Sequence, residues 1–195
     1  VNMDRYITKG KQVITAEIEN SSSFKLSDKE FDINASCQYG ELSYESDNEN
    51  VVSVDSSGHA VINGAGRAKI KVTAPAIYNY AKTVKTFNIT VRPDTVKISS
   101  ITGTAKTAAV SWKRDAEAAG YQIRYSLKSN MKNSKVCSIR KSLTKKKLRG
   151  LKSNTKYYVQ VRSYVKADDG SKIYSSWSDK KNIKTKKFKT EKKKS

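Results

Sequence analysis

Apolar and polar residues alternate with a period of two through almost the whole chain, and this alternation limits the fold more than any other feature. Phe31, Ile33, Ala35 and Cys37, for example, are separated by single polar residues. Such a period puts the apolar side chains on one face of a β-strand. Because a helical period of three to four residues is almost absent, the sequence predicts an all-β fold.

Turn residues such as those at 55–58 and 63–66 separate the expected strands. In the first half we expect strands at residues 13–18, 30–37, 41–45, 51–55, 59–63, 68–74 and 84–92. In the second half we expect them at residues 95–101, 107–113, 121–127, 135–140, 143–148, 155–164 and 173–177. Short strands at this regular spacing are typical of β-sandwiches, and seven in about 90 residues is the density of an Ig-like domain. The predicted architecture is therefore two tandem Ig-like β-sandwiches.

The charge changes at Pro93, which follows the strongest expected strand of the first half. Residues up to Pro93 carry 11 basic and 11 acidic side chains, whereas the remainder carries 28 basic and 7 acidic ones. The entire net charge of +21 thus belongs to the second half. We predict a linker at 1–10, a neutral domain at 11–93, a basic domain at 94–187 and a lysine-rich disordered tail at 188–195.

The first domain resembles the bacterial Ig-like family often called group 2, over about residues 11–93. The resemblance is carried by the segments 42–48, 51–58 (Val-Val-Ser-Val-Asp-Ser-Ser-Gly) and 64–74 (Gly-Ala-Gly-Arg-Ala-Lys-Ile-Lys-Val-Thr-Ala). The turn at Gly58 and the glycines Gly64 and Gly66 would let one strand fold back on another.

The second domain resembles a fibronectin type III domain, over about residues 94–187. Trp112 stands where that family has its early core tryptophan, and Leu151 followed by Tyr157 matches its tyrosine corner. The hydroxyl of Tyr157 would then bond a nearby backbone group. The Ser-Trp-Ser sequence at 176–178 is similar to a motif near the last strand of some members. Lys146 departs from the pattern, because an apolar residue is expected there.

The two resemblances imply a function without catalysis. Both families occur in long secreted or wall-attached bacterial proteins, as stalks, adhesion modules or accessory domains of extracellular enzymes. We therefore expect a segment of a larger extracellular protein of the cell surface or wall, monomeric in isolation, with no enzymatic activity. In this interpretation the neutral domain is a spacer and the basic domain contacts an anionic polymer. The alternative is an accessory carbohydrate-binding module of an extracellular enzyme.

Five basic residues are the predicted contacts for that polymer, because they should project from the outer face of one sheet. They are Lys97, Lys113, Lys145, Lys147 and Arg149. A surplus of 21 exceeds the roughly 2–8 that solubility asks of a small domain. The expected partner is an anionic cell-wall or host polysaccharide. Nucleic acid would bind without sequence specificity, because the chain carries no nucleic-acid-binding motif.

A second face should gather aromatic and arginine side chains from neighbouring strands. Its expected members are Arg124, Tyr158, Arg162, Tyr164 and Trp177. They can form a structural ladder of cation–π contacts, each worth about 0.5–1 kcal/mol when exposed, or a platform that binds sugar rings.

Metal, cofactor and membrane-spanning functions have no support in the sequence. One histidine and two distant cysteines, Cys37 and Cys137, cannot form a zinc site of ordinary spacing or a histidine-based triad. We expect both cysteines to be free thiols. No apolar stretch approaches the roughly 20 residues of a membrane helix, and the first ten residues lack the apolar core of a signal peptide.

Overall fold

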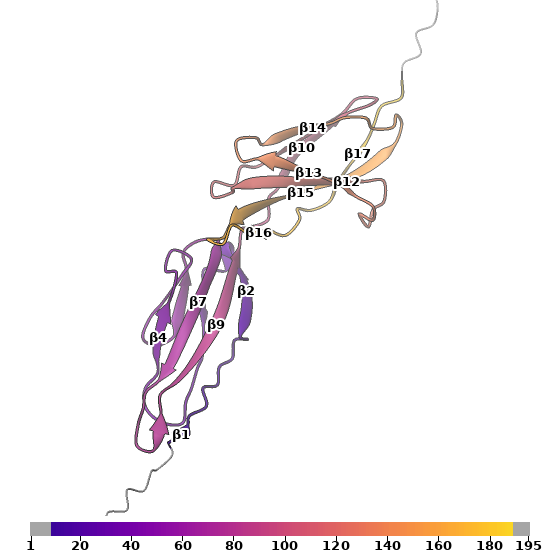
Figure 1. The fold of residues 1–195 in the computed structure, drawn as a ribbon. Coiled ribbons are helices and arrows are strands. Elements are labelled where there is room, and N and C mark those ends of the chain that lie inside the picture. The colour runs from indigo at the N-terminus through magenta and orange to yellow at the C-terminus, as the bar shows by residue number, and fades with distance from the viewer. Residues whose placement is uncertain (1–8, 189–195) are drawn as a thin grey trace, which may run out of the picture. The chain divides into compact units, whose positions relative to one another are not determined.

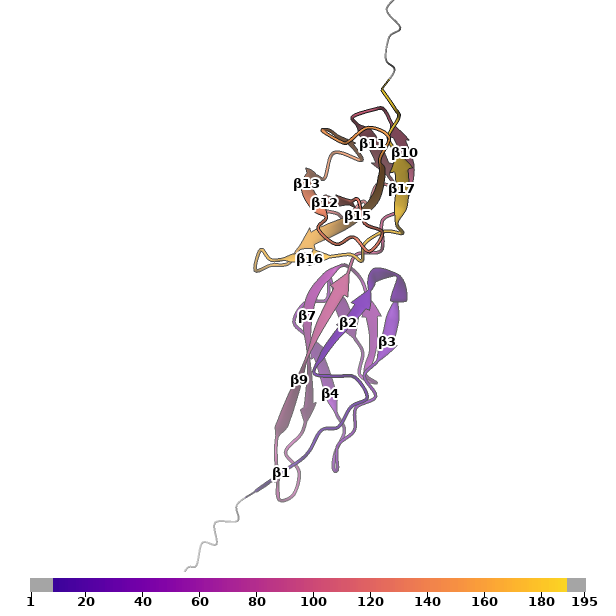
Figure 2. The same ribbon diagram turned by 90° about the vertical axis from the view of Figure 1, so that its right-hand side faces the viewer.

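A computed structural model of the chain describes residues 9–188. It divides into two compact units between Arg92 and Pro93, here called unit 1 and unit 2. Within the described residues there is no helix of the length and hydrophobicity needed to cross a bilayer. Figures 1 and 2 show that each unit is built from layers of β-strands.

Unit 1 contains nine strands and one short 3-10 helix among its described residues. In chain order they are β1 (Gly10–Lys11), β2 (Ser21–Lys25), η1 (Leu26–Asp28), β3 (Glu30–Asp32), β4 (Ser43–Ser46), β5 (Val52–Val54), β6 (His59–Ile62), β7 (Gly66–Ala74), β8 (Tyr80–Ala81) and β9 (Thr83–Arg92). One sheet has the order β2-β9-β7-β4 (Figure 1). A second sheet has the order β3-β6-β5. The strands β1 and β8 form a separate parallel pair, in which Gly10 lies opposite Tyr80.

The core of unit 1 lies between its two larger sheets. Along β7 every second residue is buried, and Ile70 and Val72 are fully enclosed together with Phe87 of β9. Gly58 takes a φ of +87°, which favours glycine, and an added Cβ would lie 2.9 Å from the Tyr44 ring. The alternation seen in the sequence thus corresponds to a buried face, and Gly58 permits the β5–β6 hairpin.

Two strands expected in unit 1 do not form as predicted. The segment 13–18 makes only one isolated bridge, between Thr15 and Ser36, and the segment 30–37 is a strand only to Asp32. Asn34 has a φ of +47°, outside the range of a strand, and its side chain donates to Glu17 at 2.6 Å. Alternation predicted the buried face of the segment 30–37 correctly, because Ile33 is in the core, but it could not predict which backbone groups pair.

Unit 2 contains eight strands among its described residues. They are β10 (Ile98–Gly103), β11 (Ala108–Trp112), β12 (Gly120–Ser126), β13 (Lys135–Arg140), β14 (Lys145–Leu148), β15 (Lys156–Lys166), β16 (Lys172–Tyr174) and β17 (Lys181–Lys184). One sheet has the order β10-β11-β14. In the other, β13-β12-β15 is extended by β16 and β17, which pair with different halves of β15 (Figure 2).

The core of unit 2 is enclosed by the facing sides of these two sheets. Val110, Tyr121, Ile123, Val159 and Val161 have no exposed surface. Lys146, which departs from the expected pattern, is paired with Val110 and is only half-buried on the edge strand β14. The predicted all-β fold of tandem sandwiches is confirmed.

Candidate functional site

The segment after β16 carries Trp177 onto the outer face of the sheet that contains β12 and β15. Two serines hold it there, because their hydroxyls accept backbone N–H groups of β15 in place of the carbonyls of a paired strand. The Ser175 hydroxyl accepts the N–H of Ser163 at 3.1 Å, and the Ser178 hydroxyl accepts the N–H of Val161 at 3.0 Å. The Ser175 and Ser178 N–H groups donate back to the carbonyls of Ser163 and Val161. Trp177 is therefore anchored on both sides to the longest strand of the unit.

Two arginines lie over the Trp177 ring. The guanidinium carbons of Arg124 and Arg162 are each 4.3 Å from a ring centroid of Trp177, and that of Arg162 is 3.8 Å from the Tyr174 ring. Partial burial lowers the pKa of both arginines from its ordinary value. These contacts form a cation–π ladder across neighbouring strands.

The arginine donors of this ladder are bonded within the sheet. Two N–H groups of Arg124 donate to Gln160 Oε1 at 3.0 and 2.6 Å, and two of Arg162 donate to Gln122 Oε1 at 3.0 and 2.7 Å. The two glutamines were not predicted, although each lies directly across the sheet from its arginine. The two glutamines accept these arginine N–H groups, and the guanidinium groups cover the indole of Trp177. The geometry therefore favours the structural ladder over a sugar platform.

Of the two tyrosines predicted for this face, Tyr164 continues the ladder and Tyr158 does not. The ring centroid of Tyr164 is 5.6 Å from that of Tyr174, and the Lys172 ammonium group is 4.6 Å from the Tyr164 ring centroid. Tyr164 packs on Gly120, its cross-strand partner, where an added Cβ would lie 2.5 Å from the tyrosine hydroxyl. Its side chain is only 9% exposed, so its ring offers little surface to a ligand. Tyr158 lies nearer the start of β15, beside Lys156, whose ammonium group is 5.2 Å from the ring centroid of Tyr158.

The residues predicted to be structural lie in the core of unit 2. Trp112 is 3% exposed and its ring centroid is 5.5 Å from that of Tyr121. Leu151 and Tyr157 are buried. The Tyr157 hydroxyl accepts the N–H of Lys152 at 3.0 Å, which fixes the loop between β14 and β15.

Lys145 and Lys147 border a shallow groove on the outer face of the β10-β11-β14 sheet, here called the hydroxyl groove. They are exposed and lie opposite Ser111 and Ala109 of β11. The groove has a volume of about 490 Å³, and none of its lining residues is acidic. They are Thr102, Gly103, Thr104, Thr107, Ala109, Lys145 and Lys147. Small hydroxyl side chains with lysines at the edge can receive an anion without electrostatic opposition.

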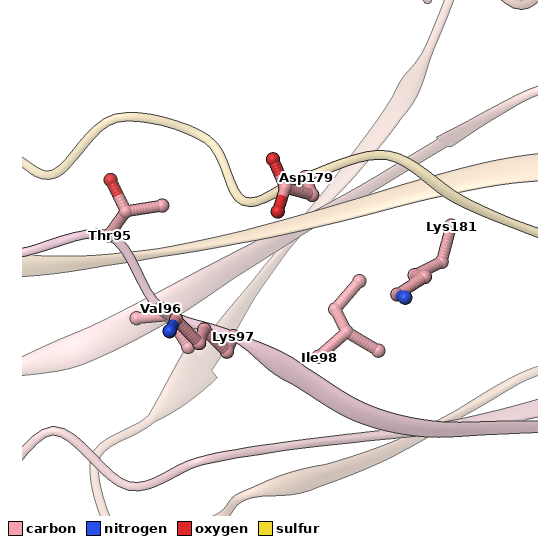
Figure 3. Close-up of a pocket in the computed structure, with 6 residues that line it drawn as sticks. All are labelled: Thr95, Val96, Lys97, Ile98, Asp179 and Lys181. Carbon is pink, nitrogen blue, oxygen red and sulfur yellow. The ribbon is translucent and has the colours of Figure 1, made fainter.

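The structure separates the five predicted basic contacts into different surroundings. Lys97 and Lys113 line a hollow of about 460 Å³ that also contains Asp94 and Asp115. Lys97 also borders a smaller hollow of about 380 Å³ with Lys181 and the Asp179 carboxylate (Figure 3). Arg149 is exposed just after β14. Carboxylates offset the positive charge around Lys97 and Lys113, so the hydroxyl groove is the stronger candidate for an anion.

Other reactive groups do not converge on a second site. The described residues contain no group of three or more histidine, cysteine or acidic side chains that could hold a metal ion. Cys37 and Cys137 are free thiols, both partly buried. The predicted tail beyond residue 188 lies outside the described residues.

Two family models match the chain. Residues 28–76 match the immunoglobulin-like domain of intimin, and residues 93–185 match the N-terminal domain of purple acid phosphatases, which is itself a fibronectin type III-like fold. These matches confirm the resemblance to a bacterial Ig-like domain followed by a fibronectin type III domain. β-Sandwich modules of these kinds are typically non-catalytic, and they are common in extracellular or surface proteins.

Solved structures of fibronectin domains are also similar to this chain. The FN1–FN3 domains of chicken CNTN1 match with a TM-score of 0.44 at 16% identity, over 76% of this chain and 58% of that one. The sixth fibronectin type III domain of a human fibronectin type III domain-containing protein 3 matches with a TM-score of 0.41 at 18% identity, over 52% of this chain and 93% of that one. No curated protein matches the sequence.

Proposed function

We propose that the chain is a non-catalytic segment of a secreted or surface-attached bacterial protein, in which unit 2 contacts an anionic wall or host polymer. The hydroxyl groove is the observation that carries this proposal. It combines two exposed lysines with a lining that includes three threonines and no acidic residue. The charge balance supports it, since the residues after Pro93 hold the whole surplus of positive charge. Unit 1 is then the spacer.

Binding at such a groove should be electrostatic and polyvalent. Lys145 and Lys147 occupy alternate positions of β14, so their side chains leave the strand on the same face about 7 Å apart. A polymer with regularly spaced anionic groups can contact both lysines and Arg149 at once. Salt should weaken this contact, because the Debye length is only about 8 Å at physiological ionic strength.

The test compares two double charge reversals with identical net charge. Lys145→Glu/Lys147→Glu changes the hydroxyl groove, and Lys97→Glu/Lys113→Glu changes the hollow that already contains carboxylates. Binding of purified teichoic acid and of a sulfated glycan is measured at 50 and 150 mM salt. We expect the first variant to lose most of the affinity and the second to lose little. Equal losses would mean that only net charge matters, and salt-independent binding would contradict the proposal.

An accessory module of an extracellular enzyme is the second candidate. The match of residues 93–185 to the N-terminal domain of purple acid phosphatases favours it, because that domain is a non-catalytic part of an enzyme. The sequence of the full-length protein distinguishes the two candidates. A hydrolase domain in the same polypeptide would favour the accessory module, whereas further Ig-like domains would favour the surface segment.

A further inference from the structure

One end of unit 1 carries an exposed cluster of tyrosines on two adjoining segments, residues 38–40 and 75–80, here called the tyrosine tip. Tyr78 is 82% exposed and Tyr39 is 38% exposed, and the ring centroids of Tyr39 and Tyr80 are 4.8 Å apart. The strand β9 begins next to the tip and runs ten residues, about 30 Å, to Arg92 (Figure 1). The tip therefore lies at the end of unit 1 that is remote from its connection to unit 2.

A buried glutamine holds the two segments of the tip together. Gln12 is 3% exposed, its Nε2 donates to the Pro75 carbonyl at 2.8 Å, and its Oε1 accepts the N–H of Tyr39 at 3.0 Å. Gly40 brings the segments still closer, because an added Cβ would lie 2.8 Å from Pro75 Cγ. The tyrosines are thus presented by a fixed support, which reduces the entropy that a ligand must offset on binding.

Tyr78 is held in a conformation that does not suit its side chain. Ile77 and Tyr80 exchange two backbone hydrogen bonds, of 3.2 and 2.9 Å, so Tyr78 and Asn79 form a two-residue hairpin turn. Tyr78 takes the first turn position with a φ of +49°, where glycine is usual and a bulky side chain is an outlier. Strain at a solvent-exposed aromatic side chain costs stability without adding core packing, which is characteristic of residues kept for recognition.

We propose that the tyrosine tip is a binding site for a neutral glycan chain. Its nine residues contain no charged side chain, although 29% of the whole chain is charged. The nearest charged residues along the chain, Glu41 and Lys82, have opposite signs, so the tip does not favour an ionic partner. Tyrosine rings offer apolar faces for the C–H surface of a sugar, and the hydroxyls and the amides of Gln38 and Asn79 can bond its hydroxyl groups. Nine residues are also fewer than the roughly 20–30 that each side of a stable protein interface uses.

This proposal makes unit 1 more than a spacer and is independent of the hydroxyl groove. Binding of a neutral ligand should depend little on salt, whereas binding of the anionic polymer should weaken as the salt concentration rises. Titrations in 0.5 M salt therefore test the tip while suppressing contacts to the basic surface.

The experiment titrates the whole chain with cellohexaose, xylohexaose and chitohexaose, by calorimetry and by backbone amide NMR shifts. At least one of the three should bind and shift the amides of residues 78–80. Tyr78→Gly removes the ring and relieves the positive φ at the same time. Binding should weaken about tenfold or more while the melting temperature of unit 1 stays equal or rises. Tyr158→Ala, on the outer face of unit 2, is the matched control and should leave affinity unchanged.

Three results would overturn the proposal. The first is that none of the three hexasaccharides binds. The second is binding that survives Tyr78→Gly but is lost in Tyr158→Ala or Trp177→Ala, which would assign the glycan to unit 2. The third is a concentration-dependent dimer in sedimentation that Tyr78→Gly abolishes, which would make the tip a contact between copies of the chain.

Discussion

At the scale of single residues, the hydroxyl of Tyr157 provides the sharpest test of side-chain orientation in unit 2. Tyr157→Phe keeps the ring but leaves the N–H of Lys152 without its acceptor. We expect this variant to lower the free energy of unfolding of unit 2 by about 1 kcal/mol or more, measured by denaturant titration. Tyr158→Phe changes the next residue, on the outer face, and should have almost no effect. Equal effects would mean that the two tyrosines exchange their faces.

His59 gives unit 1 a pH dependence that can be followed at a single resonance, because it is the only histidine. A hydrogen bond of 2.8 Å to Asp32 raises the pKa of His59, and the negative charges of Asp32, Glu30 and Asp55 add to this. The protonated ring therefore stabilises the folded state fully below about pH 6.5, and this contribution is lost as pH rises through the folded pKa.

An NMR titration of the His59 ring checks this prediction. The folded pKa should lie above about 6.5, and Asp32→Asn should bring it down towards that value because the strongest hydrogen-bond partner is removed. Glu49→Gln, an exposed change elsewhere in unit 1, should leave the pKa where it is. A His59 pKa unaffected by Asp32→Asn would show that the Asp32 contact does not persist in solution.

At the scale of elements, the Ser-Trp-Ser segment depends on hydroxyl groups that act as strand acceptors. Ser178→Ala leaves the buried N–H of Val161 without an acceptor, since the serine hydroxyl accepts it at 3.0 Å. The expected loss in the free energy of unfolding is about 1–3 kcal/mol, measured by denaturant titration of unit 2. Ser176→Ala alters the exposed serine of the same segment and should cost less than about 0.5 kcal/mol. A similar cost for both variants would contradict the proposed role of Ser178.

Strands whose two faces differ were predictable from the sequence, and strands defined only by pairing were not. The pattern of β7 and β15 is visible because burial demands an apolar residue at every second position. The strand β2 was not predicted because Ser21, Ser22 and Ser23 show no alternation of apolar and polar residues, although they pair with β9 in parallel. No local signal marks that pairing, since its partner lies more than 60 residues away along the chain.

The candidate site shows the same division at the level of side chains. Alternation correctly put Arg124 and Arg162 on the outer face of β12 and β15, but it did not reveal their glutamine partners, which depend on cross-strand register. The sequence also grouped Lys97 with Lys145 as predicted contacts, because it does not show which lysines have carboxylates beside them in the fold. The tyrosine tip was not predicted, since its two segments are 35 or more residues apart and meet through the buried Gln12.

At the scale of the whole molecule, the division between Arg92 and Pro93 predicts two units that fold independently. Each has its own enclosed core, one around Ile70 and Phe87 and the other around Tyr121 and Val161. Residues 9–92 and residues 93–188, expressed separately, should each unfold in one cooperative transition, because a complete core is what a cooperative domain requires. Calorimetry of the two fragments and of the whole chain measures this.

The difference in net charge between the two units allows a binding test with the same two fragments. In 50 mM salt the fragment 93–188 should bind teichoic acid, whereas the neutral fragment 9–92 should not, because only the former carries a surplus of positive charge. The melting temperature of each fragment should stay close to that of the corresponding transition in the whole chain. Failure of either fragment to fold alone would place the true boundary elsewhere, since a β-sandwich that lacks one of its strands leaves core side chains and strand edges exposed to water.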